Sequence, residues 1–263
     1  MAYNEAMPSN TTMRKIAEIA AEQWGLITRR QAEQAGIPER TLARLTAPGA
    51  TLARVAHGVY LVAGSPPPDH VELRAAWLQL APEVPVWSRT AEQGVVSHRS
   101  AAAIYGLGHL PADRQEFTLP RRRQVRRPDV TVHVRKLDRS DWIGIGGLPV
   151  TRPSRIASDL LWENEDHEAV ARIVVDALRD IQDYPRNFVQ ALAPHASRLG
   201  FRQGGGDQVL LWLADIGGDP EISGWIKGEL AQPIPHPVSA PDGGAITRRD
   251  VLGGIVHEYD RVA

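Results

Sequence analysis

A short run of small and apolar residues near the N-terminus restricts the possible fold more than any other feature of the sequence. Ala32 is small enough for two helices to touch, and Gly36, four residues later, suits a sharp turn between them. Apolar residues follow at Ile37, Leu42 and Leu45, where a second helix would bury them. This order is typical of a helix-turn-helix, although an ordinary helical hairpin also contains Ala-x-x-x-Gly.

The signals around this run predict where three helices begin and end. A first helix is expected over residues 14–24, with Gly25 placed to end it. Thr28 and Gln31 have the spacing of a capping box, which predicts the start of a second helix. A third helix is expected over residues 39–46, directly after the predicted turn.

Two strand-like segments follow the third predicted helix. They cover residues 52–55 and 59–62 and are separated by Ala56-His57-Gly58, a compact turn in which Gly58 can adopt a positive φ angle. Three helices followed by a hairpin form a winged helix, which favours the helix-turn-helix over the simple hairpin. We therefore expect residues 1–63 to be a winged helix-turn-helix domain that binds DNA.

In such a domain the third helix lies in the major groove, and its outer face would carry Arg40 and Arg44, one helical turn apart. An arginine fork matches O6 and N7 of guanine, so either residue could read bases. His57, at the tip of the wing, could touch the minor groove or simply occupy a turn. Any one of the arginines could instead be a solvated surface charge. The residues expected to contact DNA are Arg29, Arg30, Glu39, Arg40, Arg44, Arg54 and His57. Among them Arg29, Arg30 and Arg54 suit phosphate contacts, which position a protein without reading sequence.

A proline-rich segment at residues 64–69 is the clearest linker, because its three prolines cannot continue a strand ladder. Beyond it, residues 70–216 mix helical and alternating strand patterns and predict a mixed α/β domain. The predicted helices lie near residues 70–80, 97–104, 153–161, 170–181 and 207–216, and the predicted strands near 117–119, 130–134 and 148–150. Residues 217–263 are rich in proline and glycine and are expected to form a loosely structured tail. The expected fold class is thus α+β.

The charge is divided unevenly along the chain. Residues 1–160 contain 21 Lys and Arg against 15 Asp and Glu, whereas residues 161–263 contain 9 against 16. The basic part could therefore bind a polyanion.

The sequence contains no cysteine, which excludes disulfides and thiolate zinc sites and fits a reducing compartment. Its polar N-terminus lacks the order of a signal peptide and no apolar run approaches membrane length, so we expect a cytoplasmic protein without membrane contact.

A dense group of basic residues lies between two predicted strands and is named here the arginine segment. It could extend a DNA footprint or bind an acidic partner, or it could be a solvated loop. No aromatic residue interrupts it, which disfavours stacking on single strands. Its arginines are Arg121, Arg122, Arg123, Arg126 and Arg127.

The patterns of common catalytic and metal sites are missing from the sequence. The three glycines at 204–206 are not followed by the Lys and Ser or Thr of a phosphate-binding loop. None of the nine histidines has His-Glu-x-x-His spacing, and no lysine has an acidic residue two positions before it. Ser97 and His98 are neighbours that we do not expect to point together, and Ser97 is expected to cap a helix. The sequence thus predicts no enzymatic activity, no metal and no cofactor.

Four short segments, in this order and spacing, resemble the AbiEi-type antitoxin family of type IV toxin-antitoxin systems, including its actinobacterial members. They are ITRRQA at 27–32 leading to Gly36, AHGVY at 56–60, SHRSAA at 97–102, and PVTRPSR at 149–155 with Asp159. The resemblance covers about residues 13–200, and the sequence after Gly204 departs from the family pattern.

The resemblance implies a winged-helix domain that binds inverted repeats in its own promoter and represses the operon. It also implies a C-terminal domain that neutralises a separately encoded nucleotidyltransferase-like toxin, often in phage defence. The family's DNA contacts fall on Arg29, Arg30, Glu39, Arg40, Arg44 and Arg54, and no catalytic residue is implied. Two alternatives stay open, namely a stand-alone transcriptional regulator with a ligand- or partner-sensing C-terminal domain, and a nuclease-like enzyme with an unfamiliar metal site.

Overall fold

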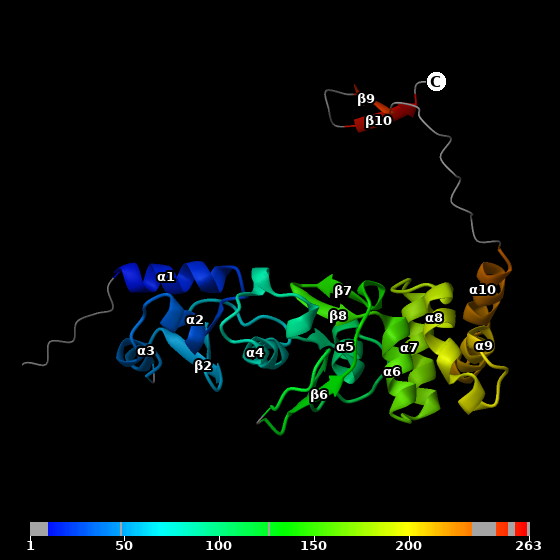
Figure 1. Ribbon diagram of the computed structural model, residues 1–263, viewed down its shortest axis with the longest axis horizontal. Coiled ribbons are helices and arrows are strands. Elements are labelled where there is room, and N and C mark those ends of the chain that lie inside the picture. The colour runs from blue at the N-terminus through cyan, green and yellow to red at the C-terminus, as the bar shows by residue number, and fades with distance from the viewer. Residues whose placement is uncertain (1–9, 48, 126, 233–245, 252–255, 262–263) are drawn as a thin grey trace, which may run out of the picture. The chain divides into compact units, whose positions relative to one another are not determined.

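The computed structural model describes residues 10–47, 49–125, 127–232, 246–251 and 256–261 (Figure 1). The helices are α1 (Asn10–Ala21), α2 (Arg29–Gln34), α3 (Glu39–Leu45), α4 (Val71–Leu80), α5 (His98–Tyr105), α6 (Pro153–Trp162), α7 (His167–Arg179), α8 (Pro185–Leu192), α9 (Gly206–Gly217) and α10 (Pro220–Ala231). The strands are β1 (Leu26–Thr28), β2 (Leu52–Ala56), β3 (Val59–Val62), β4 (Val95–Val96), β5 (Gln115–Leu119), β6 (Val130–Val134), β7 (Trp142–Ile145), β8 (Leu148–Thr151), β9 (Ile246–Val251) and β10 (Val256–Arg261).

The N-terminal part folds as the predicted winged helix. Helices α1 to α3 pack against an antiparallel sheet in the order β1-β3-β2, which includes the β2–β3 hairpin. Thr28 and Gln31 form the predicted capping box at the start of α2. The core contains the residues that the helix-turn-helix spacing predicted to be buried, together with residues of α1, β1 and β2. It consists of Ile16, Ile27, Ala32, Ile37, Leu42, Leu45 and Leu52.

The end of α1 differs from the prediction. This helix stops at Ala21, before the expected end at Trp24, because Trp24 and Gly25 have φ angles of 62° and 76°. A right-handed helix cannot continue through such left-handed positions. The turn carries the Trp24 indole away from α1, so that its Nε1 donates a hydrogen bond to the carbonyl oxygen of Gly146 at 2.9 Å.

The second part combines a mixed sheet with a group of helices. Its sheet has the order β6-β5-β4-β8-β7, in which β4 pairs parallel to β8 and antiparallel to β5. Helices α6 to α9 lie beyond this sheet in Figure 1. On α7 the predicted apolar stripe is buried through Leu178, whereas Ile181 lies past the end of the helix and is 65% exposed. These features confirm the α+β fold class.

The winged helix and the second part pack together, because the described residues from Asn10 to Glu229 form one compact unit. Besides the Trp24–Gly146 hydrogen bond, the guanidinium of Arg74 stacks over the Trp24 ring at 4.3 Å. Arg74 also donates from Nη1 to the Gly146 carbonyl at 2.8 Å. The proline-rich segment at 64–69 thus connects two parts that share an interface. We propose domain boundaries at 1–63 for the winged helix, 64–69 for the linker and 70–216 for the second domain.

The expectation of a loosely structured tail over residues 217–263 is wrong for part of that span. Helix α10 has Ile226 fully buried, and Asp219 Oδ1 accepts hydrogen bonds from the backbone N–H groups of Glu221 and Ile222 at its start. The described residues after Glu229 form a separate unit, in which β9 and β10 pair antiparallel. The remainder of the predicted tail, at 233–245, 252–255 and 262–263, lies outside the described residues. Within the described ranges, no helix is long and apolar enough to cross a membrane.

Candidate nucleic-acid interface

Helix α3 presents its arginines to solvent. Leu42 and Leu45 are almost fully buried against the winged-helix core, so the opposite face of α3 carries Arg40 and Arg44, both exposed. Gly36, with a φ of 77°, makes the turn that sets α3 at an angle to α2. Figure 1 shows α3 on the side of the winged helix turned away from α4. This face of α3 is therefore accessible to a DNA duplex, whose major groove is wide enough to admit a helix.

The first two arginines of α2 are exposed but already hold carboxylates. Arg29 forms ion pairs with Glu33 at 2.8 Å and with Glu39 at 2.7 Å, and Arg30 pairs with Glu33 at 3.1 Å. The hydrogen bond from Arg29 lowers the pKa of Glu33. Glu39 thus links α3 to α2. Exposed ion pairs contribute little to stability because water screens them, so a phosphate oxygen could replace either carboxylate.

The tip of the wing is attached to both neighbouring parts of the structure. Gly58, with a φ of 68°, makes the predicted turn, and its carbonyl oxygen accepts a hydrogen bond from the Arg29 backbone at 2.8 Å. Arg54 Nη2 lies 3.2 Å from Nδ1 of His57, and both side chains are exposed. The His57 carbonyl oxygen accepts from Nε2 of Gln79 on α4 at 2.6 Å. These contacts fix the wing tip beside α2 and α4.

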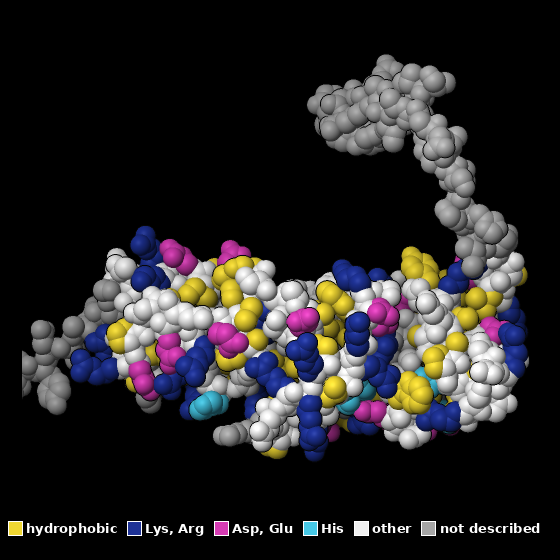
Figure 2. Space-filling view, viewed as in Figure 1, with side chains coloured by type: hydrophobic (Ala, Val, Ile, Leu, Met, Phe, Trp, Pro, Cys, Tyr) yellow, Lys and Arg dark blue, Asp and Glu magenta, His cyan; other side chains and the backbone are white. Residues whose placement is uncertain are grey.

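Two concave surfaces meet at His57 and Gln79. The first, of about 430 Å³, is lined also by Arg29 and Arg30 of α2. The second, of about 270 Å³, is lined also by residues of the arginine segment, including Arg123. Figure 2 shows dark-blue Lys and Arg side chains along this lower edge of the molecule, from the region of β2 toward β6. The hollowed surface is therefore basic at both ends.

The arginine segment divides into exposed and anchored residues. Arg121, Arg122 and Arg123 follow β5 and are exposed. Arg127, before β6, forms an ion pair with Asp129 and donates from Nη1 to Oε1 of Gln79 at 2.5 Å. Arg126 lies outside the described residues. Because Gln79 binds both Arg127 and the His57 carbonyl, one side chain joins the arginine segment to the wing.

The structure corrects two expectations about Ser97 and His98. Ser97 occupies the N-cap position of α5, but its side chain makes no capping hydrogen bond. Ser97 Oγ instead lies 2.9 Å from Nδ1 of His98, so these neighbours do point together. The reason is the backbone of His98, whose φ of 51° differs from the helical value that the sequence predicted. Since Ser97 is fully buried, the pair does not form an accessible nucleophile and base.

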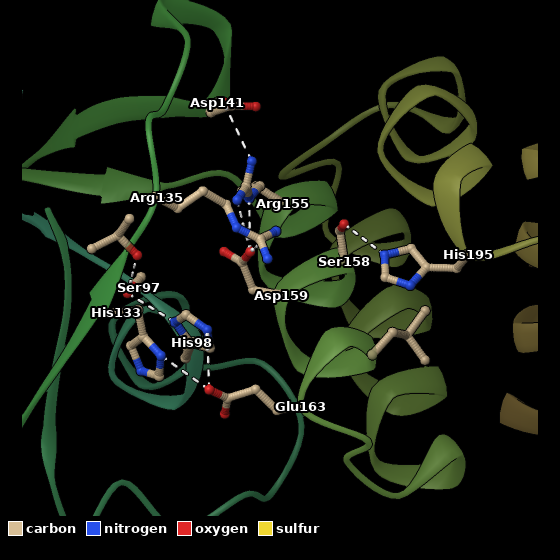
Figure 3. Close-up of polar contacts among 12 residues, drawn as sticks. Ser97, His98, His133, Arg135, Asp141, Arg155, Ser158, Asp159, Glu163 and His195 are labelled. Carbon is tan, nitrogen blue, oxygen red and sulfur yellow. Dashed lines mark hydrogen bonds and ion pairs between the residues drawn. The ribbon is translucent and has the colours of Figure 1, made fainter. Parts of the chain in front are cut away.

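The structure also assembles a cluster that sequence reasoning missed. His98 from the start of α5, His133 from β6 and Glu163 directly after α6 offer ligand atoms that lie within 4.8 Å of one another (Figure 3). They lie in three segments that are far apart in the sequence, so no short sequence motif indicates the cluster.

The outward α3 and the β2–β3 wing define a winged helix-turn-helix protein. Residues 14–63, which cover this part of the structure, match the family model described as transcriptional regulator, AbiEi antitoxin. The match confirms the resemblance to AbiEi-type antitoxins over the winged helix. The matched family is described as one of transcriptional regulators. No curated protein matches the sequence.

One similar solved structure is described as the crystal structure of the RV2827C protein from Mycobacterium tuberculosis. It is 16% identical to this chain, with a TM-score of 0.48, and the similarity covers 90% of this chain and 88% of that one.

Proposed function

We propose that the chain is a cytoplasmic antitoxin that binds its own promoter and represses its operon, with no catalytic step of its own. The main support is α3, which carries Arg40 and Arg44 on an exposed face within the segment that matches the regulator family. Major-groove reading requires a protruding helix with side chains that can reach base edges. The operator we expect is double-stranded DNA with inverted repeats, as the family resemblance implies.

The proposed roles of the remaining residues follow from their positions. Arg29, Arg30 and Arg54 would hold phosphates on either side of α3, and His57 would lie at the edge of the groove. Glu39, which is paired with Arg29, would position that arginine and contribute no base contact of its own. Phosphate contacts of this kind make binding depend steeply on salt.

The DNA part of the proposal is tested with the promoter that precedes the gene. Fluorescence anisotropy should show tight binding of the full chain to this promoter and weaker binding to a scrambled duplex of equal length. Substituting both Arg40→Ala and Arg44→Ala should remove most of the preference for the promoter. Unchanged promoter affinity in the double variant would refute the assignment of α3.

The antitoxin part is tested by co-expression. The resemblance implies a separately encoded nucleotidyltransferase-like toxin, and co-expressing this chain with such a neighbouring gene product should restore growth. The Arg40→Ala, Arg44→Ala double variant is a useful control, since we assign neutralisation to the second domain and expect the variant still to protect. Continued toxicity with the wild-type chain would remove the antitoxin role while leaving promoter binding intact. A defence role against phage would be measured afterwards as plaque formation with and without the gene pair.

A further inference from the structure

We propose that His98, His133 and Glu163 form a binding site for a divalent transition-metal ion of the zinc class. The first support is the geometry of the donor atoms. Glu163 Oε1 lies 3.0 Å from Nδ1 of His133 and 3.7 Å from Nε2 of His98. Ligands bound tetrahedrally to zinc at about 2.0–2.1 Å are about 3.4 Å apart, and the two observed distances bracket that separation.

The second support is the way in which each histidine is held. His98 has its other ring nitrogen, Nδ1, 2.9 Å from Ser97 Oγ, and Ser97 Oγ in turn accepts a hydrogen bond from Thr118. His133 has its other nitrogen, Nε2, 3.0 Å from Glu116 Oε2. Histidines that bind metals usually donate their second N–H to an oxygen in this way, which fixes the tautomer and the ring orientation. Both rings therefore have the outer contacts of metal ligands.

The third support comes from the backbone and the burial of His98. Its φ of 51° is a left-handed conformation, which a residue with a side chain adopts only when surrounding contacts outweigh the strain. That conformation places the ring against His133, with centroids 3.5 Å apart and ring planes at 16°, so the two rings must turn apart for both lone pairs to point at one ion. The ring is also almost fully buried, so the surrounding residues hold it in this position.

The charges around the cluster permit a cation. Arg135 and Arg155 lie nearby, but both contact Asp159 Oδ1, at 3.4 and 2.8 Å. Arg155 also lies 3.5 Å from Asp141. Glu163 contributes a negative charge directly. Figure 3 shows the arginines gathered around Asp159, on the side of the cluster away from Glu163.

The donor set decides the class of ion and how it would enter. Two imidazoles and one carboxylate suit zinc and its first-row neighbours, whereas calcium and magnesium prefer oxygen ligands alone. Glu163 has a side chain that is 45% exposed, while the His98 side chain is 5% exposed. An ion could therefore enter from the Glu163 side, where water could complete its coordination. The proposal does not depend on DNA binding, since none of these residues lies in the winged helix.

The test is isothermal titration of the full, tag-free chain with zinc chloride, because a polyhistidine tag would itself bind the ion. We expect one saturable site per chain. His98→Ala, His133→Ala and Glu163→Gln should each weaken the site at least about tenfold, and Ser97→Ala should weaken it about 10- to 100-fold through the lost outer contact. His109→Ala, which removes an exposed histidine outside the cluster, should leave the affinity unchanged.

Visible absorption of the cobalt-loaded chain gives a second readout that a purely structural role of these residues would not produce. Tetrahedral d–d bands should form in the wild-type chain and in His109→Ala and be lost in the three ligand variants. If His98→Ala fails to fold, as judged by circular dichroism, Glu163→Gln decides the question because its side chain is half exposed. Absence of a saturable zinc site in the wild-type chain, or equal affinity in wild type and Glu163→Gln, would overturn the proposal.

Discussion

At the residue scale, replacing Arg40 and replacing Arg30 by alanine should weaken DNA binding in different ways. Arg40→Ala should relax the preference for one base pair by about 1–3 kcal/mol, because a guanidinium that contacts a base edge carries sequence information. Arg30→Ala should weaken all duplexes alike and reduce the slope of log K against log salt by about 1. Anisotropy titrations against promoter variants at several potassium chloride concentrations separate the two effects. Equal loss of base preference in both variants would contradict the assignment.

His195 is a buried residue whose titration should make stability depend on pH. It is fully buried, with Nε2 2.9 Å from Ser158 Oγ, and burial, followed by the charge of Arg198, lowers its pKa to about 4. The charges of Arg135 and Arg155 act in the same direction. An unfolded histidine has a pKa near 6.5, so between these values the unfolded chain binds more protons. The contribution of His195 to the free energy of unfolding should therefore fall by at most about 3 kcal/mol as the pH drops from about 6.5 to 4.

Urea unfolding at pH 7 and pH 4.5, with a chelator present, measures this loss. His195→Gln removes the titration while keeping a group that can hydrogen-bond to Ser158, so its loss on acidification should be smaller than that of the wild type. His109→Gln, which changes an exposed histidine, is the matched control and should behave as the wild type does. Identical pH dependence in His195→Gln and wild type would show that His195 is not the group responsible.

Single residues also show what the sequence could and could not reveal. The burial of Leu42 and Leu45 followed from their spacing, and so did the exposure of Arg40 on the opposite face. The cluster of His98 and Glu163 did not, because it depends on where β6 and the end of α6 come together in the fold. Even the contact between adjacent Ser97 and His98 was missed, since it requires a positive φ that no residue type there announces.

At the scale of elements, the same substitution should have opposite effects in the α2–α3 turn and in α10. Gly36 has a φ of 77° and open space where a Cβ would lie, so Gly36→Ala should destabilise by about 1–2 kcal/mol through backbone strain alone. Gly224 lies inside α10, also with open space, and Gly224→Ala should stabilise by about 0.5–1 kcal/mol because alanine favours a helix. Thermal and urea unfolding of the two variants would check both signs. Destabilisation by Gly224→Ala would argue against a stable α10.

Elements with strong local signals were predicted well, and those defined by distant partners were not. The strands β2 and β3 were predicted because a turn separates two apolar segments. In contrast, β1 has only three residues and is a strand because β3 pairs with it. The helix α10 contains Gly224 and Gly228, which weaken its propensity, although Asp219 followed by Pro220 is a helix-start signal that the sequence does carry.

At the scale of the whole molecule, the question is whether the winged helix and the arginine segment act on one duplex. They belong to one compact unit, and Gln79 joins the wing carbonyl of His57 to Arg127. Since the two concave surfaces share His57 and Gln79, a duplex bound by α2 and the wing could continue toward Arg123. An acidic protein partner is the competing use of the same charges.

Replacing Arg121, Arg122 and Arg123 together by glutamine should distinguish these uses. If they contact phosphates, affinity for all duplexes should fall and the salt slope should decrease by about 2–3, since each lost phosphate contact removes about 0.9. The control replaces Arg172, Arg179 and Arg202 by glutamine, which changes the net charge equally at exposed positions of the helical region. Combined with Arg40→Ala, the losses should add within about 0.5 kcal/mol, because separate contacts are independent. Equal DNA binding in the two triple variants would exclude the extended footprint. In that case, weaker capture of the co-expressed toxin by the variant of Arg121, Arg122 and Arg123, but not by the control, would assign the arginine segment to the protein partner.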